Sequence, residues 1–310
     1  MSSKTDAFCS YHPIVNMLYF VLVIGCAMVL THPVCLGLSF LCAFSYSIYL
    51  NGKRALRFNL LYMLPMLLIA MLINPAFNHQ GVTILAYLPS GNPLTLESIL
   101  YGISAAFLLI TVITWFSCFN TVMTSDKFVY LFGRIIPALS LILSMALRFV
   151  PRFTAQIKII SNAQRCVGRD VRNGGVFKRA KHGIKILSVL VTWALENAID
   201  TADSMKSRGY GLPGRSAFSV FRFDKRDKLA LLFLLFCGGY VITGAALGGL
   251  KFLYYPFIES KALSPYLISL FFIWLALIAM PIFINVKEDL KWKTIQARLE
   301  ADSQPSPSKT

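Results

Sequence analysis

The chain has 310 residues, of which 56% are hydrophobic and 14% are charged, and its net charge is +16. A soluble domain normally carries about 25% charged residues, so this composition excludes an ordinary soluble protein. Several nearly charge-free windows of about 20 residues are long enough to cross a bilayer as helices. The sequence therefore predicts an all-α polytopic membrane protein.

Six apolar segments are predicted to span the membrane, at 14–31, 34–50, 58–74, 98–118, 229–249 and 265–286. Two further apolar runs, 138–150 and 184–199, are short for a span and carry or adjoin charged residues. No small-residue cleavage site follows the first apolar segment, so we interpret it as a span rather than a removed signal peptide.

The basic residues predict which side of the membrane each loop occupies. The loop 51–57 holds three basic residues, whereas 75–96 holds no charged residue. Since Lys and Arg stay on the cytoplasmic side, we expect 75–96 to be external and both termini to be cytoplasmic. Residues 151–228 hold 16 of the 30 Lys and Arg residues, against six acids. A crossing at 138–150 would place this basic block outside, so we expect both ambiguous runs to stay in the cytoplasm.

These assignments divide the chain into four parts. The first four spans occupy 1–124, a cytoplasmic region occupies 125–228, and the last two spans occupy 229–290. Residues 291–310, which include two prolines near the end, are predicted to form a flexible cytoplasmic tail.

Two long helices are expected in the basic region, lying at the cytoplasmic boundary with their apolar faces toward lipid and the spans. One carries Arg148 and Arg152 on one face with Pro151 between them, and the proline should kink it. The other carries a polar stripe at helical spacing, made of Lys185, Ser188, Thr192, Glu196, Asp200, Asp203 and Ser207. If the helices cross, the arginines could pair with Glu196, Asp200 and Asp203. Ordinary interfacial helices that only complete the fold are the simpler alternative.

Both helices are predicted to end in similar basic, glycine-containing segments. Ser207-Arg208-Gly209 ends the second helix, where glycine takes a left-handed conformation cheaply and arginine suits the negative end of the helix dipole. The first helix ends in Arg165-Cys166-Val167-Gly168-Arg169. A helix cap explains one such end, but two similar ends suggest a pair of prongs for a cytoplasmic partner.

Three stretches carry a resemblance to a known family: LRFVPRF at 147–153, NAQRCVGRD at 162–170 and ADSMKSRGYG at 202–211. Two more, NHQGVTILAYL at 78–88 and LTLESILYG at 94–102, are also in the style of that family. Over about 10–290 the chain resembles the transmembrane T component of energy-coupling factor (ECF) transporters, the family that includes the cobalt-transporter permease subunit. One position departs from the family pattern. The first signature should read Ala-Arg-Gly, but this chain has Cys166-Val167-Gly168, and either Arg165 or Arg169 could substitute for the missing central arginine.

The resemblance implies a non-catalytic scaffold in the plasma membrane of a prokaryotic cell. Such a scaffold ties two cytoplasmic ABC-type ATPase subunits to a small membrane S component that captures a vitamin or metal ion. ATP and Mg would be bound by the ATPases, and no cofactor by this chain. The resemblance assigns ATPase coupling to Ser207, Arg208, Gly209, Arg165, Cys166, Val167, Gly168 and Arg169. Structural contacts between the helices would come from Arg148, Pro151, Arg152, Glu196, Asp200 and Asp203.

Other features of the sequence bear on alternative functions. It has no G-x-x-x-x-G-K-[ST] phosphate loop, and no acid lies well inside a predicted span, as ion-coupled transport usually requires. The four histidines, at 12, 32, 79 and 182, are scattered and do not predict a metal site, so His79 is interpreted as a loop residue. The basic residues cluster in loops, so no nucleic-acid partner is expected. The permease of a conventional ABC importer and a membrane adaptor without a transport role remain alternatives.

Overall fold

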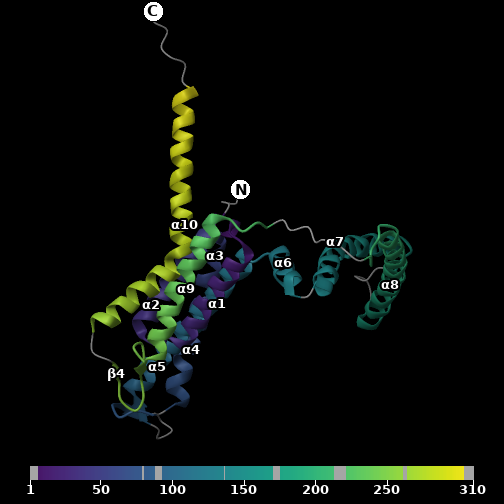
Figure 1. Ribbon diagram of the computed structural model, residues 1–310. Coiled ribbons are helices and arrows are strands. Elements are labelled where there is room, and N and C mark those ends of the chain that lie inside the picture. Colours follow the sequence, from purple (N-terminus) through teal and green to yellow (C-terminus); the bar gives the residue numbers. More distant parts are fainter. Residues whose placement is uncertain are drawn as a thin grey trace, which may run out of the picture. The chain divides into compact units, whose positions relative to one another are not determined.

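The computed structural model describes residues 6–78, 80–87, 93–135, 137–169, 175–212, 221–260 and 264–303. His79 and residues 304–310 of the predicted tail lie outside these ranges. The chain forms two compact units (Figure 1). Unit 1 comprises Met1–Thr124 with Phe221–Thr310, and unit 2 comprises Ser125–Val220.

Unit 1 is a helical bundle that contains all six predicted spans. Its helical elements are η1 (Phe8–Ser10), α1 (Pro13–Val29), α2 (Pro33–Asn51), α3 (Lys53–Phe58), the π-helical turn η2 (Asn59–Met63), α4 (Leu64–Phe77), α5 (Leu96–Val122), α9 (Lys225–Ala246) and α10 (Pro265–Ser303). Among the residues that the structure describes, five stretches are long and apolar enough to cross a membrane: α2, Lys53–Phe77, α5, α9 and α10. The sixth, α1, is equally apolar in character but has 17 residues. The prediction of an all-α polytopic membrane protein is confirmed.

Local sequence determines where several of these helices begin. His12 and His32 each accept a hydrogen bond from a backbone N–H in the first helical turn, and each precedes a proline at the first helical position. Proline fits there because the first turn leaves its N–H groups without helical partners. Asp224 and Asp227 form a capping box at the start of α9, each side chain accepting from the other's backbone N–H.

The core of unit 1 is a cluster of aromatic and aliphatic side chains from α1, α2, α5, α9 and α10. Trp115 of α5 donates from Nε1 to Ser39 Oγ at 3.0 Å. Tyr19 of α1 donates from its hydroxyl to the carbonyl oxygen of Ile278 in α10 at 3.0 Å. Because an unpaired polar group is costly inside an apolar bundle, these bonds fix the register of the helices that they join.

Two antiparallel hairpins lie at one end of unit 1 (Figure 1). One pairs β1 (Ile84–Tyr87) with β2 (Pro93–Thr95), and the other pairs β3 (Phe252–Leu253) with β4 (Glu259–Ser260). A hydrogen bond joins the loops at this end: Asn78, which follows α4, donates from Nδ2 to the hydroxyl of Tyr255, which lies between β3 and β4, at 3.1 Å.

The N-terminal segment is fastened at the opposite end of unit 1. Asp6 bonds the Asn285 amide and accepts from the Tyr46 hydroxyl at 3.0 Å, and the backbone N–H of His12 donates to Asp227. From this end α10 continues as a helix to Ser303. The expectation of a flexible tail beginning at 291 is therefore wrong for 291–303, where the mixed charged and apolar residues extend the helix.

Unit 2 consists of α6 (Ser125–Ile135), α7 (Pro137–Cys166) and α8 (Val176–Ser207). Both long helices exceed the apolar runs that predicted them. At 1.5 Å per residue, the 32 residues of α8 extend about 48 Å. Pro151 lies inside α7, and the residues on both sides of it are helical.

Candidate functional site

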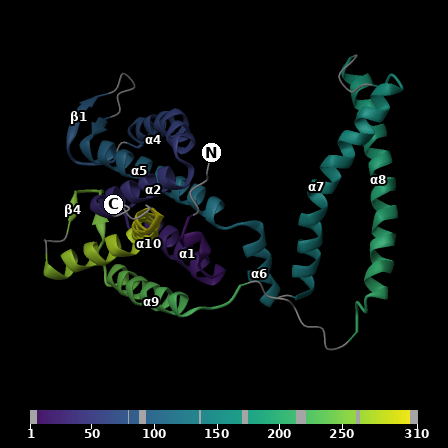
Figure 2. The same cartoon turned by 90° about the horizontal axis from the view of Figure 1, so that it is seen from above.

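The candidate site is the α7–α8 pair of unit 2, which Figure 2 shows as two long helices lying next to each other. A small apolar cluster holds them together, consisting of Ile160 from α7 and Ile186 and Leu190 from α8, with Trp193 packed against it. The ring of Phe153 meets Trp193 edge-on at 5.9 Å. This is a modest contact for helices of such length, so much of their surface remains exposed.

The helix α8 presents three different faces. Ile186, Leu190, Trp193 and Asn197 follow one another at helical spacing on the face toward α7. A second face exposes the apolar residues Ile184, Leu187, Val191, Leu195 and Ile199. The third face is the predicted polar stripe, in which Lys185, Ser188, Thr192, Glu196, Asp200, Asp203 and Ser207 are all exposed.

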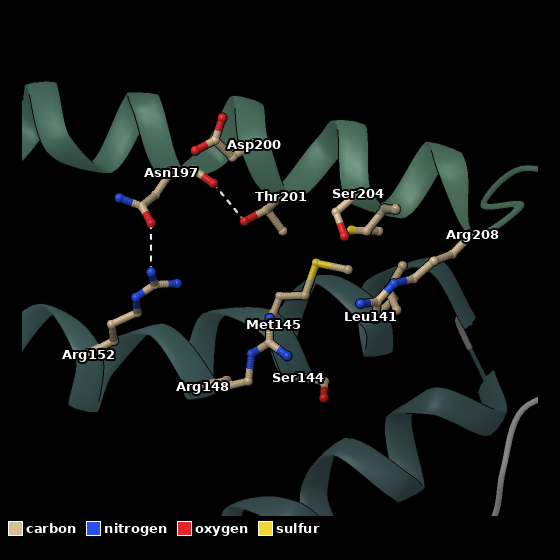
Figure 3. A pocket seen from close by; sticks show the side chains of 11 residues that line it. Leu141, Ser144, Met145, Arg148, Arg152, Asn197, Asp200, Thr201, Ser204 and Arg208 are labelled. Carbon is tan, nitrogen blue, oxygen red and sulfur yellow. Dashed lines mark hydrogen bonds between the residues drawn. The ribbon is translucent and has the colours of Figure 1, made fainter.

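The predicted pairing of arginines with acids is wrong. Within the described part of the chain, Arg148 and Arg152 make no ion pair with Glu196, Asp200 or Asp203. The physical reason is the direction of the acids: Glu196 and Asp203 belong to the exposed stripe, and the carboxylate of Asp200 is directed away from α7 (Figure 3).

Arg152 instead contacts two residues that the sequence analysis did not select. Its Nη2 donates to Asn197 Oδ1 at 2.7 Å, and its guanidinium lies over the Trp193 ring at 5.4 Å. A hydrogen bond from a charged donor and a cation–π contact both favour one side-chain orientation. Arg152 is therefore a positioned cross-link between α7 and α8.

The helix α8 ends in a Schellman motif, in which two backbone bonds close the last turn. The N–H of Gly209 donates to the Lys206 carbonyl and that of Tyr210 to the Met205 carbonyl, both at 3.0 Å. Gly209 has φ +80°, a left-handed conformation that glycine adopts without the penalty of a side chain. The predicted role of Gly209 in ending the helix is confirmed.

The helix α7 ends in the same motif. The N–H of Gly168 donates to the Arg165 carbonyl at 3.0 Å, and that of Arg169 to the Gln164 carbonyl at 2.9 Å. Gly168 has φ +79°, which matches Gly209. The backbones of the two predicted prongs thus end in equivalent geometry, although their side chains differ.

This equivalence shows which residues correspond in the two signatures. Val167 occupies the position of Arg208, directly before the left-handed glycine. In the same way Cys166 corresponds to Ser207, Arg165 to Lys206 and Arg169 to Tyr210. The central arginine of the first signature is therefore absent in space as well as in sequence, and Arg165 and Arg169 occupy different positions.

A cavity of about 580 Å³ opens between α7 and α8 near the end of α8 (Figure 3). Leu141, Ser144, Met145, Arg148 and Arg152 line it from α7, and Asn197, Asp200, Thr201, Ser204, Met205 and Arg208 line it from α8. We call this cavity the arginine groove, because it gathers three arginines against one acid. All three arginines were candidate site residues in the sequence, but their spacing did not predict that they line one cavity.

The side chain of Arg208 differs in direction from the expectation. A position at the tip of a prong predicts a side chain that projects beyond the helix. Figure 3 shows it running back from the end of α8 toward Leu141 of α7, so that it lines the groove. It lies on the α7-facing side because it follows Asn197 and Thr201 at helical spacing.

Metal binding has no candidate among the described residues, since no three His, Cys, Asp or Glu side chains gather closely enough to hold an ion. Among the cysteines of the described residues, Cys166 at the end of α7 is exposed. The features that distinguish this site are therefore its two helix ends and its arginine groove.

The profile of the cobalt transport protein (CbiQ) family matches residues 10–220, which include five of the helices of unit 1 and the whole of unit 2. The chain belongs to the cobalt transport protein family. This assignment agrees with the resemblance to ECF T components noted from the signatures.

Individual proteins that are similar to this chain match a shorter part of it than the family profile does. A protein of Lactobacillus helveticus, described as energy-coupling factor transporter transmembrane protein EcfT, is 40% identical over 105 residues. Proteins of the same description from Leuconostoc gelidum and Lactococcus lactis are 38% identical over 105 residues and 36% identical over 98 residues. The matches cover 31–34% of this chain and 37–38% of those relatives. The chain thus spans about two fifths of the length of the curated relatives that it matches.

Proposed function

We propose that this member of the cobalt transport protein family is the T component of an ECF-type ABC importer. In this role it couples ATP hydrolysis by two cytoplasmic ATPase subunits to reorientation of a substrate-binding S component, for uptake of a vitamin or metal ion. The observation that carries the proposal is the pair of long helices, α7 and α8, that end in the same glycine-closed motif. Two equivalent helix ends could each bind one subunit of a partner that is present as two copies or as two homologous chains.

The chemistry of the second helix end suits a protein partner. Arg208 is exposed on the last turn of α8, and a guanidinium can donate several hydrogen bonds in fixed directions to carboxylates or carbonyls. The chain itself has no phosphate-binding loop of the common type, so ATP would be bound by other subunits. This chain would then be a non-catalytic subunit without a bound cofactor.

The distribution of charge supports a topology for the proposed transporter. The end of unit 1 that holds Asp6 and Asn285 also holds the basic residues of the starts of α3 and α9, namely Lys53, Arg54, Arg57, Lys225, Arg226 and Lys228. By the positive-inside rule this end is cytoplasmic, together with unit 2 and both termini. The hairpin end is then external.

The exposed apolar face of α8 supports a second contact. Ile184, Leu195 and Ile199 are each more than 60% exposed, which is unfavourable in water but suits lipid or a hydrophobic subunit. In the proposed transporter, this face lies at the membrane boundary, against lipid and the S component. Arg208 and its counterpart on α7 then meet the ATPases.

Purification of the tagged chain from its native membrane tests the proposal. Two ATPases together with a small hydrophobic subunit are the expected partners. ATPases with a soluble binding protein would instead indicate a conventional ABC importer. Absence of any ATPase under conditions that preserve membrane complexes would contradict the proposal and indicate an adaptor.

A further inference from the structure

The arginine groove carries positive charge that no contact within the described part of the chain neutralises. Arg152 is engaged by Asn197 and Trp193. Arg148 lies over the ring of Phe149 at 5.8 Å, but in the described ranges neither it nor Arg208 has an acid within ion-pair distance. These two arginines line the same cavity from opposite helices.

The one acid of the groove does little to offset this charge. Figure 3 shows the carboxylate of Asp200 directed away from α7. Like charges on the two walls repel each other, so an anion between them would lower the electrostatic energy of the pair. The hydroxyls of Ser144 and Ser204 also line the cavity and can donate to an oxyanion.

The size and lining of the groove indicate the kind of anion. At about 580 Å³ the cavity exceeds the volume of one phosphate group, and Leu141, Met145 and Met205 contribute apolar surface to it. A ligand that combines an oxyanion with an apolar part uses both kinds of lining. Exposed apolar residues on the neighbouring face of α8, such as Leu195 and Ile199, are suited to contact with lipid at a membrane interface.

We propose that the arginine groove binds the phosphate of an anionic phospholipid headgroup, with Arg148 and Arg208 holding it from the two walls. Arg152 is a positioning residue that fixes the separation of α7 and α8. Basic pockets between helices at a cytoplasmic membrane surface are suited to such headgroups. The proposal concerns the helices of the proposed function but requires no ATPase. Arg208 belongs to both proposals, so Arg148 is the residue that separates them.

The test measures lipid binding by the purified, delipidated full chain with native mass spectrometry. Phosphatidylglycerol and phosphatidylcholine of identical acyl chains are titrated separately. We expect wild-type protein to prefer phosphatidylglycerol, and Arg148→Gln or Arg208→Gln to weaken that binding roughly fivefold, as loss of one interfacial arginine contact implies. Arg298→Gln, which removes an exposed arginine near the end of α10, is the matched control and should bind as wild type does. Arg148→Lys should retain part of the preference.

Three outcomes would overturn the proposal. The first is an unchanged phosphatidylglycerol preference in a monodisperse Arg148→Gln protein. The second is found by titrating inorganic phosphate alone. If phosphate binds as tightly as the lipid does, and this binding depends on Arg148, free phosphate is the ligand. The third is loss of ATPase co-purification in Arg148→Gln with unchanged lipid binding, which would make the groove a protein contact. Failure of ATPase capture by wild-type protein would contradict only the proposed function.

Discussion

Val167 and Arg208 occupy equivalent positions at the ends of α7 and α8, each directly before a glycine with φ near +80°. The backbone geometry of the two ends is the same, whereas an aliphatic side chain stands at one and a guanidinium at the other. The two helix ends are therefore alike in shape and unlike in chemistry. A partner that binds through charge-assisted hydrogen bonds would distinguish them.

The two glycines provide a matched pair of substitutions. Gly168→Ala and Gly209→Ala each force alanine into the left-handed region, which costs about 1–2 kcal/mol. A Cβ at 209 would also approach Leu212 Cδ1 at 3.1 Å, whereas a Cβ at 168 meets nothing within 4 Å. Hydrogen exchange should therefore accelerate in the last turn of both helices, and more at α8. Equal exchange in Gly209→Ala and wild type would show that the Schellman motif does not stabilise this end.

The neighbouring residues Glu196 and Asn197 should differ sharply in their importance. Asn197→Ala removes the acceptor of Arg152 and should destabilise unit 2 by about 1 kcal/mol, less than is usual for a bond to a charged group, because this bond is exposed to solvent. Glu196 lies on the exposed stripe, so Glu196→Ala should change stability by less than about 0.5 kcal/mol. Thermal unfolding of the purified variants measures both effects.

A double-mutant cycle between Arg152→Ala and Asn197→Ala checks that the contact itself is responsible. Residues that bond each other give a combined loss smaller than the sum of the two single losses. Strict additivity would mean that the Arg152–Asn197 bond contributes nothing to stability.

Packing between α9 and α10 depends on a small residue at 244. A Cβ at Gly244 would overlap the buried side chain of Leu270, and overpacking of this kind typically costs about 1–3 kcal/mol. Gly244→Ala should therefore lower the midpoint of thermal unfolding. Gly239→Ala is the control on the same helix, because its Cβ meets nothing within 4 Å. A drop of similar size in both variants would show that helix flexibility, rather than contact with Leu270, explains the effect.

The proposed topology can be tested with cysteine labelling. Cys166 is exposed at the end of α7, so an impermeant maleimide should label it in inverted vesicles but not in intact cells. In a Cys166→Ser background, Leu85→Cys should give the reverse pattern, since Leu85 is 54% exposed on β1. Labelling of Cys166 from outside intact cells would refute a cytoplasmic location for unit 2.

Apolar run length predicted the six apolar segments that unit 1 contains, because a bilayer requires about 20 apolar residues of each spanning helix. The limits of α7, α8 and α10 were harder to predict. Their ends contain mixed charged and apolar residues. Such residues occur within helices as readily as in the loops that follow them, so they do not mark where a helix ends. The glycine-containing ends were predictable, because left-handed backbone favours glycine.

The contact face of α8 could not be recognised from its own sequence. Two of its faces carry polar residues, and the more obvious one, containing Glu196 and Asp203, is exposed. The face that meets α7 carries Trp193 and Asn197 among aliphatic residues. The heptad-like spacing of Ile186, Leu190, Trp193 and Asn197 is a signal that could have identified this face. The groove itself depends on how two helices are placed, and no single helical pattern contains that information.

The most direct test of the account compares charge reversal at Arg208 with substitutions at the equivalent Val167, using ATPase co-purification with the tagged chain after a salt wash. Arg208→Glu should lose most of the bound ATPase, because removing one partner of a buried charged contact costs about 2–5 kcal/mol. Val167→Ala should retain it, and Val167→Arg should bind at least as well as wild type. All three proteins should insert into the membrane normally. Unchanged ATPase binding in Arg208→Glu would contradict the account and reduce Arg208 to a helix-end residue without a coupling role.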